Sequence, residues 1–417
     1  MTDRSSLRID GARLWQSLME MAQIGATAKG GCNRQALTDE DREGRNLFLR
    51  WCEQIGCRVS VDAIGNIFAR RDGLDNSLPP ILAGSHLDTQ PTGGKFDGVY
   101  GVLAGLEVLR TLEDQQIVTT APLEVAVWTN EEGSRFNPAM IGSAVWSGAL
   151  DIETAYASTD KSGKTMGGEL ERIGYRGELP ASARPLKAAF EVHIEQGPIL
   201  EQEKRQIGVL SGIQGLRWYD LIINGDACHA GPTPMESRRD PFMAAAPIIT
   251  SCYQLAAAHG PWGRATFGDI RAEPGSRNTV PERLVISVDL RHPDADRLDQ
   301  MDREFRALVA EQCAAYRLDY EVNETWHMPV TSFAPHCVQA VREATAKLGY
   351  SNMDMVSGAG HDSLYIATVA PTAMIFVPCE NGISHNESEN AKAEDLEAGG
   401  NVLLHAMLAM DAEVMGG

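Results

Sequence analysis

The sequence contains no long apolar run, no CxxC pair of cysteines and no excess of positive charge. Nowhere in its 417 residues does an uninterrupted apolar stretch approach the roughly 20 residues that a membrane-spanning helix requires. The first residues, Met1 to Arg8, include basic side chains but no apolar core behind them, which does not fit a secretory signal. We therefore expect a protein that neither spans a membrane nor carries an export signal.

Cysteine usage and charge exclude further classes of protein. The eight cysteines are scattered, which is typical of reduced thiols in a cytoplasmic protein and argues against a disulfide framework or a zinc ribbon. Lys and Arg number 37 and Asp and Glu number 57, which gives a net charge of −20. This balance argues against nucleic acid or an anionic membrane surface as the partner.

Length and patterning predict an α/β fold with an inserted domain. A chain of 417 residues is too long for one ordinary core. Strand-like runs that end in polar residues, at 80–84, 123–128 and 190–194, alternate with helix-like segments and predict a sheet flanked by helices. From Gly215 the order becomes β-α-β-β-α-β, which predicts a ferredoxin-like α+β unit. The expected division is a first catalytic part at 1–213, an inserted domain at 214–329 and a second catalytic part at 330–417.

The segment after the strand at 80–84 carries the first candidate site residues. His86 and Asp88 follow the end of the strand, and a glycine-rich turn then brings Asp97 to the start of the next helix. The carboxyl end of a strand is where an α/β sheet normally places its chemistry. We expect the Asp88 carboxylate to hold the His86 imidazole in one tautomer while the other ring nitrogen binds a metal. The alternative is a polar loop in which Asp97 only caps the helix.

Other strand ends offer the same kind of side chain, and together they predict a metal site. Glu131 and Glu132 follow the strand at 123–128, and the strand at 190–194 carries a histidine near its end. The complete candidate ligand set is His86, Asp97, Glu132, His193 and His385. Imidazole and carboxylate without thiolate fit Zn²⁺, with Mn²⁺, Co²⁺ or Ni²⁺ as replacements. Glu131 is left free to act as a base on water.

Five motifs together resemble one family over nearly the whole chain. They are His86-Leu-Asp88, Gly94-Lys-Phe-Asp97-Gly98, Asn130-Glu-Glu-Gly-Ser-Arg-Phe136, His193-Ile-Glu-Gln-Gly-Pro198 and Cys228-His-Ala-Gly-Pro-Thr-Pro-Met235. The resemblance is to the hydantoinase/carbamoylase branch of the M20-related dinuclear-metal amidohydrolases. That branch includes N-carbamoyl-L-amino-acid hydrolases, β-ureidopropionases and allantoate amidohydrolases.

The resemblance implies a dinuclear site and a dimer. One ion would be held by His86, Asp97 and His193, and the other by Asp97, Glu132 and His385. Glu131 would deprotonate water and protonate the leaving amine, so that a ureido acid yields amino acid, CO₂ and ammonia. His229 would help the ions to stabilise the oxyanion. In the family this histidine comes from the smaller, lid-like domain of the partner subunit, which implies a homodimer.

Further residues are implied to contact the substrate. Arg217, Asn278 and Arg291 are similar to the family's binders of the substrate carboxylate, which a planar guanidinium suits. Gln196 and His361 are implied to lie in or next to the site. A proline at position 232 replaces the threonine of many members, which removes one hydroxyl from this motif. A Cys228–His229 nucleophile pair is disfavoured because no third group orients it.

Several readings of the function stay open at this point. The first is hydrolysis of an N-carbamoyl α- or β-amino acid, with allantoate as a further possible substrate, because the shape of the pocket decides among them. The second is an M20-type peptidase or N-acyl-amino-acid hydrolase, against which His193 and the Asn278 and Arg291 pair count. The third is a non-catalytic relative that binds an anionic ligand.

Overall fold

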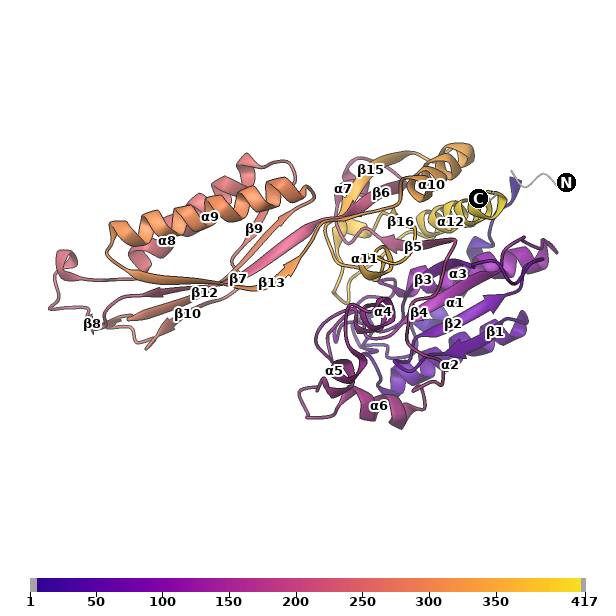
Figure 1. Ribbon diagram of the computed structural model, residues 1–417, viewed down its shortest axis with the longest axis horizontal. Helices are drawn as coiled ribbons and strands as arrows, with labels where there is room; N and C mark the ends of the chain where they lie inside the picture. Colours follow the sequence, from indigo (N-terminus) through magenta and orange to yellow (C-terminus); the bar gives the residue numbers. More distant parts are fainter. Residues whose placement is uncertain (1–5, 414–417) are drawn as a thin grey trace. The chain divides into compact units, whose positions relative to one another are not determined.

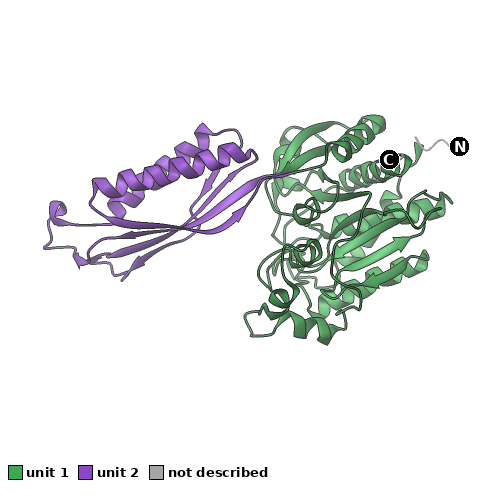
Figure 2. Ribbon diagram, in the orientation of Figure 1, with its two compact units in different colours: residues 1–212, 332–417 green, residues 213–331 purple. Residues whose placement is uncertain are grey.

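The computed structural model describes residues 6–413, which form two compact units (Figure 2). Among the described residues, unit 1 comprises 6–212 and 332–413, and unit 2 comprises 213–331. Unit 1 is therefore built from both ends of the chain, and unit 2 is the segment between them. None of the described helices is both long and apolar enough to cross a membrane.

A nine-stranded mixed sheet forms the centre of unit 1, in the order β1-β2-β4-β3-β5-β16-β6-β14, with β15 paired to β6 (Figure 1). The strands are β1 (Arg58–Val61), β2 (Ile67–Arg71), β3 (Ile81–His86), β4 (Leu123–Trp128), β5 (Ala188–Ile194), β6 (Ile207–Ile213), β14 (Thr331–Ser332), β15 (Asn352–Ser357) and β16 (Thr372–Val377). The neighbours β4, β3, β5 and β16 run parallel, and every residue in them is buried. Parallel strands that are covered on both faces have sequences that are almost continuously apolar. Their carboxyl ends meet at one edge of the sheet.

Helices cover both faces of this sheet. They are α1 (Gly11–Met21), α2 (Asp39–Gln54), α3 (Val99–Asp114), α4 (Ile141–Ser147), α5 (Ile152–Ala157), α6 (Met166–Ile173), α7 (Ile199–Gln202), α10 (Pro335–Leu348), α11 (Ser363–Ile366) and α12 (Ala393–Ala412), with a 3₁₀ turn η3 (Glu380–Gly382). α3 and α12 pack on the central strands, and α1 and α10 pack on α12. On the other face Trp128 of β4 packs against Trp146 of α4. The sequence at the start of a helix can stabilise it, as in α2. The Thr38 side chain accepts a hydrogen bond from the Asp41 N–H, and the acidic residues of the first turn interact favourably with the helix dipole.

Unit 2 is an antiparallel sheet with two helices on one face. Its strands are β7 (Gly215–Asn224), β8 (Cys228–His229), β9 (Arg264–Thr266), β10 (Ile270–Glu273), β11 (Thr279–Val280), β12 (Arg283–His292) and β13 (Asp319–Met328), and its helices are α8 (Phe242–Ala258), α9 (Ala295–Ala315) and the 3₁₀ turn η2 (Met235–Ser237). The main sheet has the order β10-β12-β7-β13, with β9 also paired to β12. Alternate residues of β7 and β12, such as Tyr219, Leu221 and Ile286, face the core shared with α8 and α9.

The predicted fold class is confirmed, with two differences in unit 2. The second strand of the predicted β-α-β-β-α-β order corresponds to residues 264–272, and the structure divides this run into β9 and β10, which both pair with β12. The separate ribbon of β8 and β11 was not predicted, because each strand has only two residues and shows no alternation. This ribbon matters because it carries His229.

Candidate metal centre

The central strands of unit 1 bring candidate ligands to the same edge of the sheet. His86 is the last residue of β3 and pairs with Trp128, the last residue of β4. His193 lies near the end of β5 and pairs with Phe376 of β16. Gly98, with φ 67°, allows Asp97 to approach, because a Cβ atom at this position would collide with the His86 ring.

The candidate ligands form two triads that share Asp97. The first triad is His86, Asp97 and His193, and the second triad is Asp97, Glu132 and His385. In each triad the potential ligand atoms all lie within 4.8 Å of one another. Asp97 Oδ1 is 3.2 Å from His193 Nε2 and 3.6 Å from His86 Nε2, whereas Oδ2 is 3.4 Å from His385 Nε2. The two oxygens of one carboxylate therefore face different triads, which suits a ligand that bridges two ions.

The orientation of two imidazoles also suits metal binding. His86 Nδ1 is 2.8 Å from the carbonyl oxygen of Asp88, and His193 Nδ1 is 2.9 Å from that of Ile194. A carbonyl oxygen can only accept, so Nδ1 carries the proton in both rings. In the neutral form of each ring, which is the form that binds metal, Nε2 is the unprotonated nitrogen and lies beside Asp97. His193 Nε2 also accepts the backbone N–H of Gly98 at 3.1 Å.

The predicted role of the Asp88 carboxylate is wrong. Its Oδ1 is 4.0 Å from His86 Nδ1, beyond hydrogen-bond distance, because the backbone carbonyl of Asp88 occupies that position. The carboxylate instead accepts the backbone N–H groups of Glu131 and Glu132, each at 3.2 Å. Asp88 therefore holds the main chain of Glu131 and Glu132 in place. The distance between these residues along the sequence does not predict this contact.

Asp88→Asn tests this new role. The amide oxygen of asparagine accepts like a carboxylate oxygen, but the amide NH₂ would face one of the two backbone N–H groups. We expect kcat to fall about 10- to 100-fold with a small change in melting temperature, as for other groups that orient ligands of a metal. Steady-state kinetics and metal analysis on the same preparation provide the measurement. A kcat equal to that of the unsubstituted protein would contradict the role.

Charges around the triads favour cations. Burial raises the pKa of Glu131, which is 8 % exposed, well above its usual value. Burial disfavours the charged form of His86, but Glu131 and Asp97 outweigh it and raise the His86 pKa well above its usual range. Hydrogen bonds to Asp97 and Glu132 raise the pKa of His385 to about 11. Without metal, protons on the imidazoles supply the positive charge that the carboxylates require.

Loading metal should therefore release protons. At pH 7 the raised pKa values keep His86 and His385 protonated, whereas a metal ion binds only the neutral ring, so the apparent affinity for metal should rise with pH. Titration calorimetry of metal-free protein with Zn²⁺ at pH 7, in two buffers of different ionisation enthalpy, should give different heats. Equal heats in the two buffers would show that no net proton leaves.

Two other predicted residues lie beside the triads. Gln196 donates from Nε2 to Asp97 Oδ2 at 2.8 Å. His361 is 2 % exposed, and its ring centroid lies 4.6 Å from that of His193. His361 also belongs to a third cluster with His193 and Glu191. Glu191 already accepts from Ser85 Oγ and from Ser363, so its oxygens are satisfied by the protein. We therefore place no ion in this third cluster.

His229 and Asn278 lie next to each other in unit 2. His229 of β8 pairs with Thr279 of β11, and the N–H of Ala230 donates to the Asn278 carbonyl at 2.9 Å. The His229 side chain is exposed, and its Nδ1 accepts from the Gly231 N–H at 3.1 Å. In the neutral ring the proton then lies on Nε2, so His229 presents a hydrogen-bond donor to solvent.

The two predicted arginines cannot share one carboxylate, because they lie on opposite faces of the sheet in unit 2. Arg217 pairs with Leu290, and Arg291 is the next residue along β12, so the strand pleat directs Arg217 and Arg291 to different faces. Nη1 and Nη2 of Arg217 bind Glu324 at 2.7 Å and Asp299 at 2.6 Å. These ion pairs give Arg217 a role within unit 2 and disfavour it as a substrate contact.

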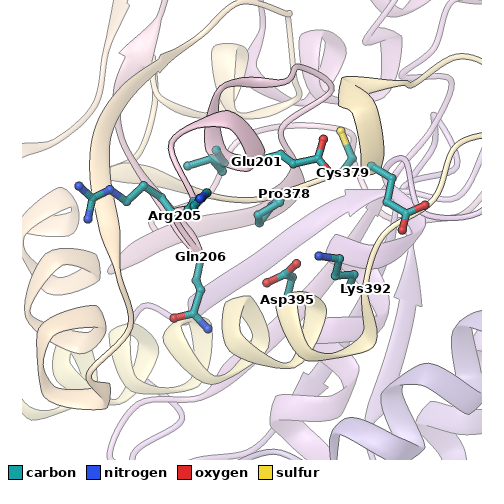
Figure 3. A pocket seen from close by; sticks show the side chains of 10 residues that line it. Glu201, Arg205, Gln206, Pro378, Cys379, Lys392 and Asp395 are labelled. Atoms are coloured by element: carbon teal, nitrogen blue, oxygen red, sulfur yellow. The ribbon is translucent and has the colours of Figure 1, made fainter.

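A cavity of about 200 Å³ lies in unit 1 beside the segment that leads to His385 (Figure 3). Cys379 lines it, but none of the triad residues does. Burial raises the pKa of the Cys379 thiol to about 12, so the thiol is not a nucleophile at neutral pH. This cavity therefore offers no thiol nucleophile.

Comparison with known proteins assigns the family. The sequence profile of peptidase family M20/M25/M40 matches residues 82–409. The chain belongs to this family. Within it, a hydantoinase/carbamoylase family amidase from Burkholderia multivorans has a solved structure with a TM-score of 0.94 and 53 % identity, covering 98 % of this chain and 99 % of that one. The predicted family branch is thereby confirmed.

Curated M20-family relatives carry two activities in their names. An N-carbamoyl-L-amino-acid amidohydrolase of Rhizobium meliloti is 47 % identical over 96 % of both chains. An allantoate amidohydrolase of Bacillus subtilis is 33 % identical over 91 % of this chain and 92 % of that one. Both relatives match almost from end to end, so unit 1 and unit 2 are both included.

Proposed function

We propose that the protein is a metal-dependent amidohydrolase that cleaves the carbamoyl C–N bond of N-carbamoyl-L-amino acids. The observation that carries this proposal is that two triads share Asp97. Glu131 lies beside them and is a member of neither triad. The 47 % identity to an N-carbamoyl-L-amino-acid amidohydrolase supports the choice of substrate over allantoate, whose hydrolase is 33 % identical.

The donor atoms of the triads fit two divalent cations. Each triad supplies imidazole nitrogen and carboxylate oxygen without thiolate, which suits Zn²⁺ and also Mn²⁺, Co²⁺ or Ni²⁺. Two such ions would polarise the carbamoyl oxygen and make water more acidic. Asp97 would contribute one oxygen to each ion, and His86, His193, Glu132 and His385 would complete the two sets.

Glu131 is the proposed general base. Its Oε2 lies 3.4 Å from His86 Nε2, at the edge of the first triad. Its raised pKa lets the carboxyl group keep a proton that it has taken from the attacking water. Glu131 then delivers that proton to the amino nitrogen as the C–N bond breaks. The products are the free amino acid and carbamic acid, which decomposes to CO₂ and ammonia.

Unit 2 would supply the groups that hold the substrate. The Nε2–H of His229 can donate to the carbamoyl oxygen as negative charge develops on it. Arg291 is the proposed binder of the substrate carboxylate, as the family resemblance implies, because a guanidinium can donate two hydrogen bonds to a carboxylate. In the structure its Nε and Nη2 donate to Asp289 at 3.0 and 2.7 Å. Asn278, beside His229 on the ribbon, is the proposed neighbour of that carboxylate.

A homodimer is part of the proposal and is supported by the outer surface of α8. The seventeen residues of this helix include no charged side chain. Phe242, Met243 and Tyr253 are 45 %, 42 % and 50 % exposed. Several exposed apolar side chains on one uncharged helix are typical of a surface that contacts another protein. We propose a second copy of the chain as that protein, with its His229 completing the site.

The test of the function is ammonia release from a panel of ureido acids. N-carbamoyl-L-α-amino acids, N-carbamoyl-β-alanine and allantoate are each offered to metal-loaded protein and to protein treated with a chelator. We expect the fastest release from an N-carbamoyl-L-α-amino acid and none after chelation. Faster turnover of allantoate would transfer the assignment to that substrate, and no release of ammonia from any compound of the panel would contradict it.

Arg291→Ala and Arg217→Ala form a matched pair for the carboxylate contact. Removing Arg291 should raise KM at least about 10-fold, because charge-assisted hydrogen bonds to a carboxylate contribute about 1.5–3 kcal/mol. Removing Arg217 should leave KM close to its original value and cost under about 1 kcal/mol of stability, as for other partly exposed ion pairs. Steady-state kinetics decide the matter. A larger KM change for Arg217→Ala would reverse the two assignments.

A further inference from the structure

Glu389 is a buried carboxylate that joins two of the three segments that carry the second triad, those of Asp97 and His385. It is 2 % exposed and lies four residues after His385. Its Oε1 accepts the backbone N–H groups of Phe96 and Asp97 at 2.9 and 3.2 Å. Its Oε2 accepts from Ser384 Oγ at 2.9 Å. One side chain thus holds the main chain of Asp97 and the residue that precedes His385.

The same hydroxyl lies between Glu389 and the bridging carboxylate. Ser384 Oγ is 2.8 Å from Asp97 Oδ2, the oxygen that faces the second triad, and its single proton can be donated to only one of the two carboxylates at a time. The space for Glu389 depends on Gly94, because a Cβ atom at that position would collide with the Glu389 carboxyl group. The loop that carries Asp97 is therefore shaped to receive Glu389 from the other end of the chain.

The second triad depends on its loop more than the first triad does. His86 and His193 are each 1 % exposed and lie in β3 and β5, whereas the side chain of His385 is 51 % exposed. The backbone of His385 has φ 53°, a left-handed conformation that costs free energy in a residue other than glycine. Contacts of the surrounding loop must maintain this conformation. Glu389 makes two of them, through its Oε2 to Ser384 Oγ and through its backbone N–H to the Asn386 carbonyl.

We propose that Glu389 is a positioning residue that affects the affinity of the second triad for its metal ion more strongly than that of the first triad. Its contact with the Asp97 main chain is common to both triads, whereas its contact with Ser384 reaches only the second. The inference rests on the proposed dinuclear function. Glu389 acts through the Asp97 main chain and through Ser384, and it occupies no ligand position itself. A side chain that only stabilised the fold would change the melting temperature but would not distinguish between the two ions.

Glu389→Ala and Glu389→Gln separate these roles. Alanine removes every acceptor for the two N–H groups. Glutamine keeps Oε1 as their acceptor, and its NH₂ can donate to Ser384 Oγ while the Ser384 hydroxyl donates to Asp97 Oδ2. We expect alanine to weaken binding of one of the two Zn²⁺ ions about 10- to 100-fold. We expect glutamine to weaken that step by less than about 10-fold.

Asp411→Ala is the matched control. Asp411, in α12, also accepts two backbone N–H groups from the first part of the chain, Thr120 at 3.1 Å and Ala121 at 2.8 Å. It takes no part in the triads. Asp411→Ala also removes a side chain that accepts two backbone N–H groups. It should therefore lower the melting temperature, while both Zn²⁺ affinities stay as in the unsubstituted protein.

The measurement is calorimetric titration of metal-free full-length protein with Zn²⁺, with metal content after dialysis as the second readout. Loss of one ion in Glu389→Ala, with both ions kept in Asp411→Ala, supports the inference. Two ions bound with unchanged affinity in Glu389→Ala, or equal weakening of both ions, overturns it. If Glu389→Ala does not fold, Ser384→Ala tests the same path and should weaken the same ion. Fewer than two ions in the unsubstituted protein would instead contradict the proposed dinuclear function.

Discussion

Replacing Glu131 by glutamine should reduce turnover about 10²- to 10⁴-fold, which is the usual contribution of a general base. An amide of nearly the same shape fits the buried position but cannot take a proton from water. The backbone N–H of residue 131 would still donate to Asp88, so the loop should stay in place. Metal content should equal that of the unsubstituted protein, because Glu131 belongs to neither triad. Kinetics and metal analysis on one preparation measure both quantities.

Glu132→Gln is the control for that experiment. Glu132 is the neighbouring residue but belongs to the second triad, and its Oε2 lies 3.2 Å from His385 Nε2. The Glu132→Gln variant should lose both activity and one metal ion. The Glu131→Gln variant should lose activity but keep its full metal content. Hydrolysis at an unchanged rate in Glu131→Gln would remove Glu131 from the role of base.

Mixing two inactive variants should restore activity if His229 acts across a dimer. His229→Ala removes the donor to the oxyanion, and loss of such a donor costs about 10²- to 10³-fold in kcat. In a mixed dimer of His229→Ala and Glu131→Gln, one site has its own Glu131 and the partner's His229. Random mixing in equal amounts gives half mixed dimers with one working site each, so about a quarter of full activity should return.

The outcome of mixing separates two arrangements of the site. Recovery after exchange of subunits, measured as ammonia release, supports contribution of His229 in trans. If activity stays at the level of the separate variants although mixed dimers have formed, His229 acts within its own chain. A protein that is monomeric in solution and fully active would contradict the proposed homodimer directly.

The sequence predicted the edge of the sheet that carries the site because periodicity locates strand ends. His86, Glu132 and His193 follow or end buried apolar runs, and parallel strands bring such residues together. Their proximity is therefore a property of the fold class. Their roles as ligands stay predictions, supported by the shared Asp97 and by the family.

Contacts that depend on backbone direction could not be predicted in this way. Asp88 was assigned to His86 because the spacing allowed it, but the turn after β3 presents its carbonyl and not its carboxylate. Arg217 and Arg291 both looked suitable as anion binders, and only the register of β7 with β12 places them on opposite faces. Glu389 gave no signal, because its partners lie almost 300 residues earlier, at Phe96 and Asp97.

Anomalous diffraction from crystals of metal-loaded protein can show whether the five side chains of the triads hold two metal ions. Data collected at the absorption edge of the bound metal should show two peaks about 3.5–4 Å apart, as in other two-metal sites, with Asp97 between them. His86 and His193 should contact one peak, and Glu132 and His385 the other. A single peak, or a peak in the Glu191, His193 and His361 cluster, would contradict the account.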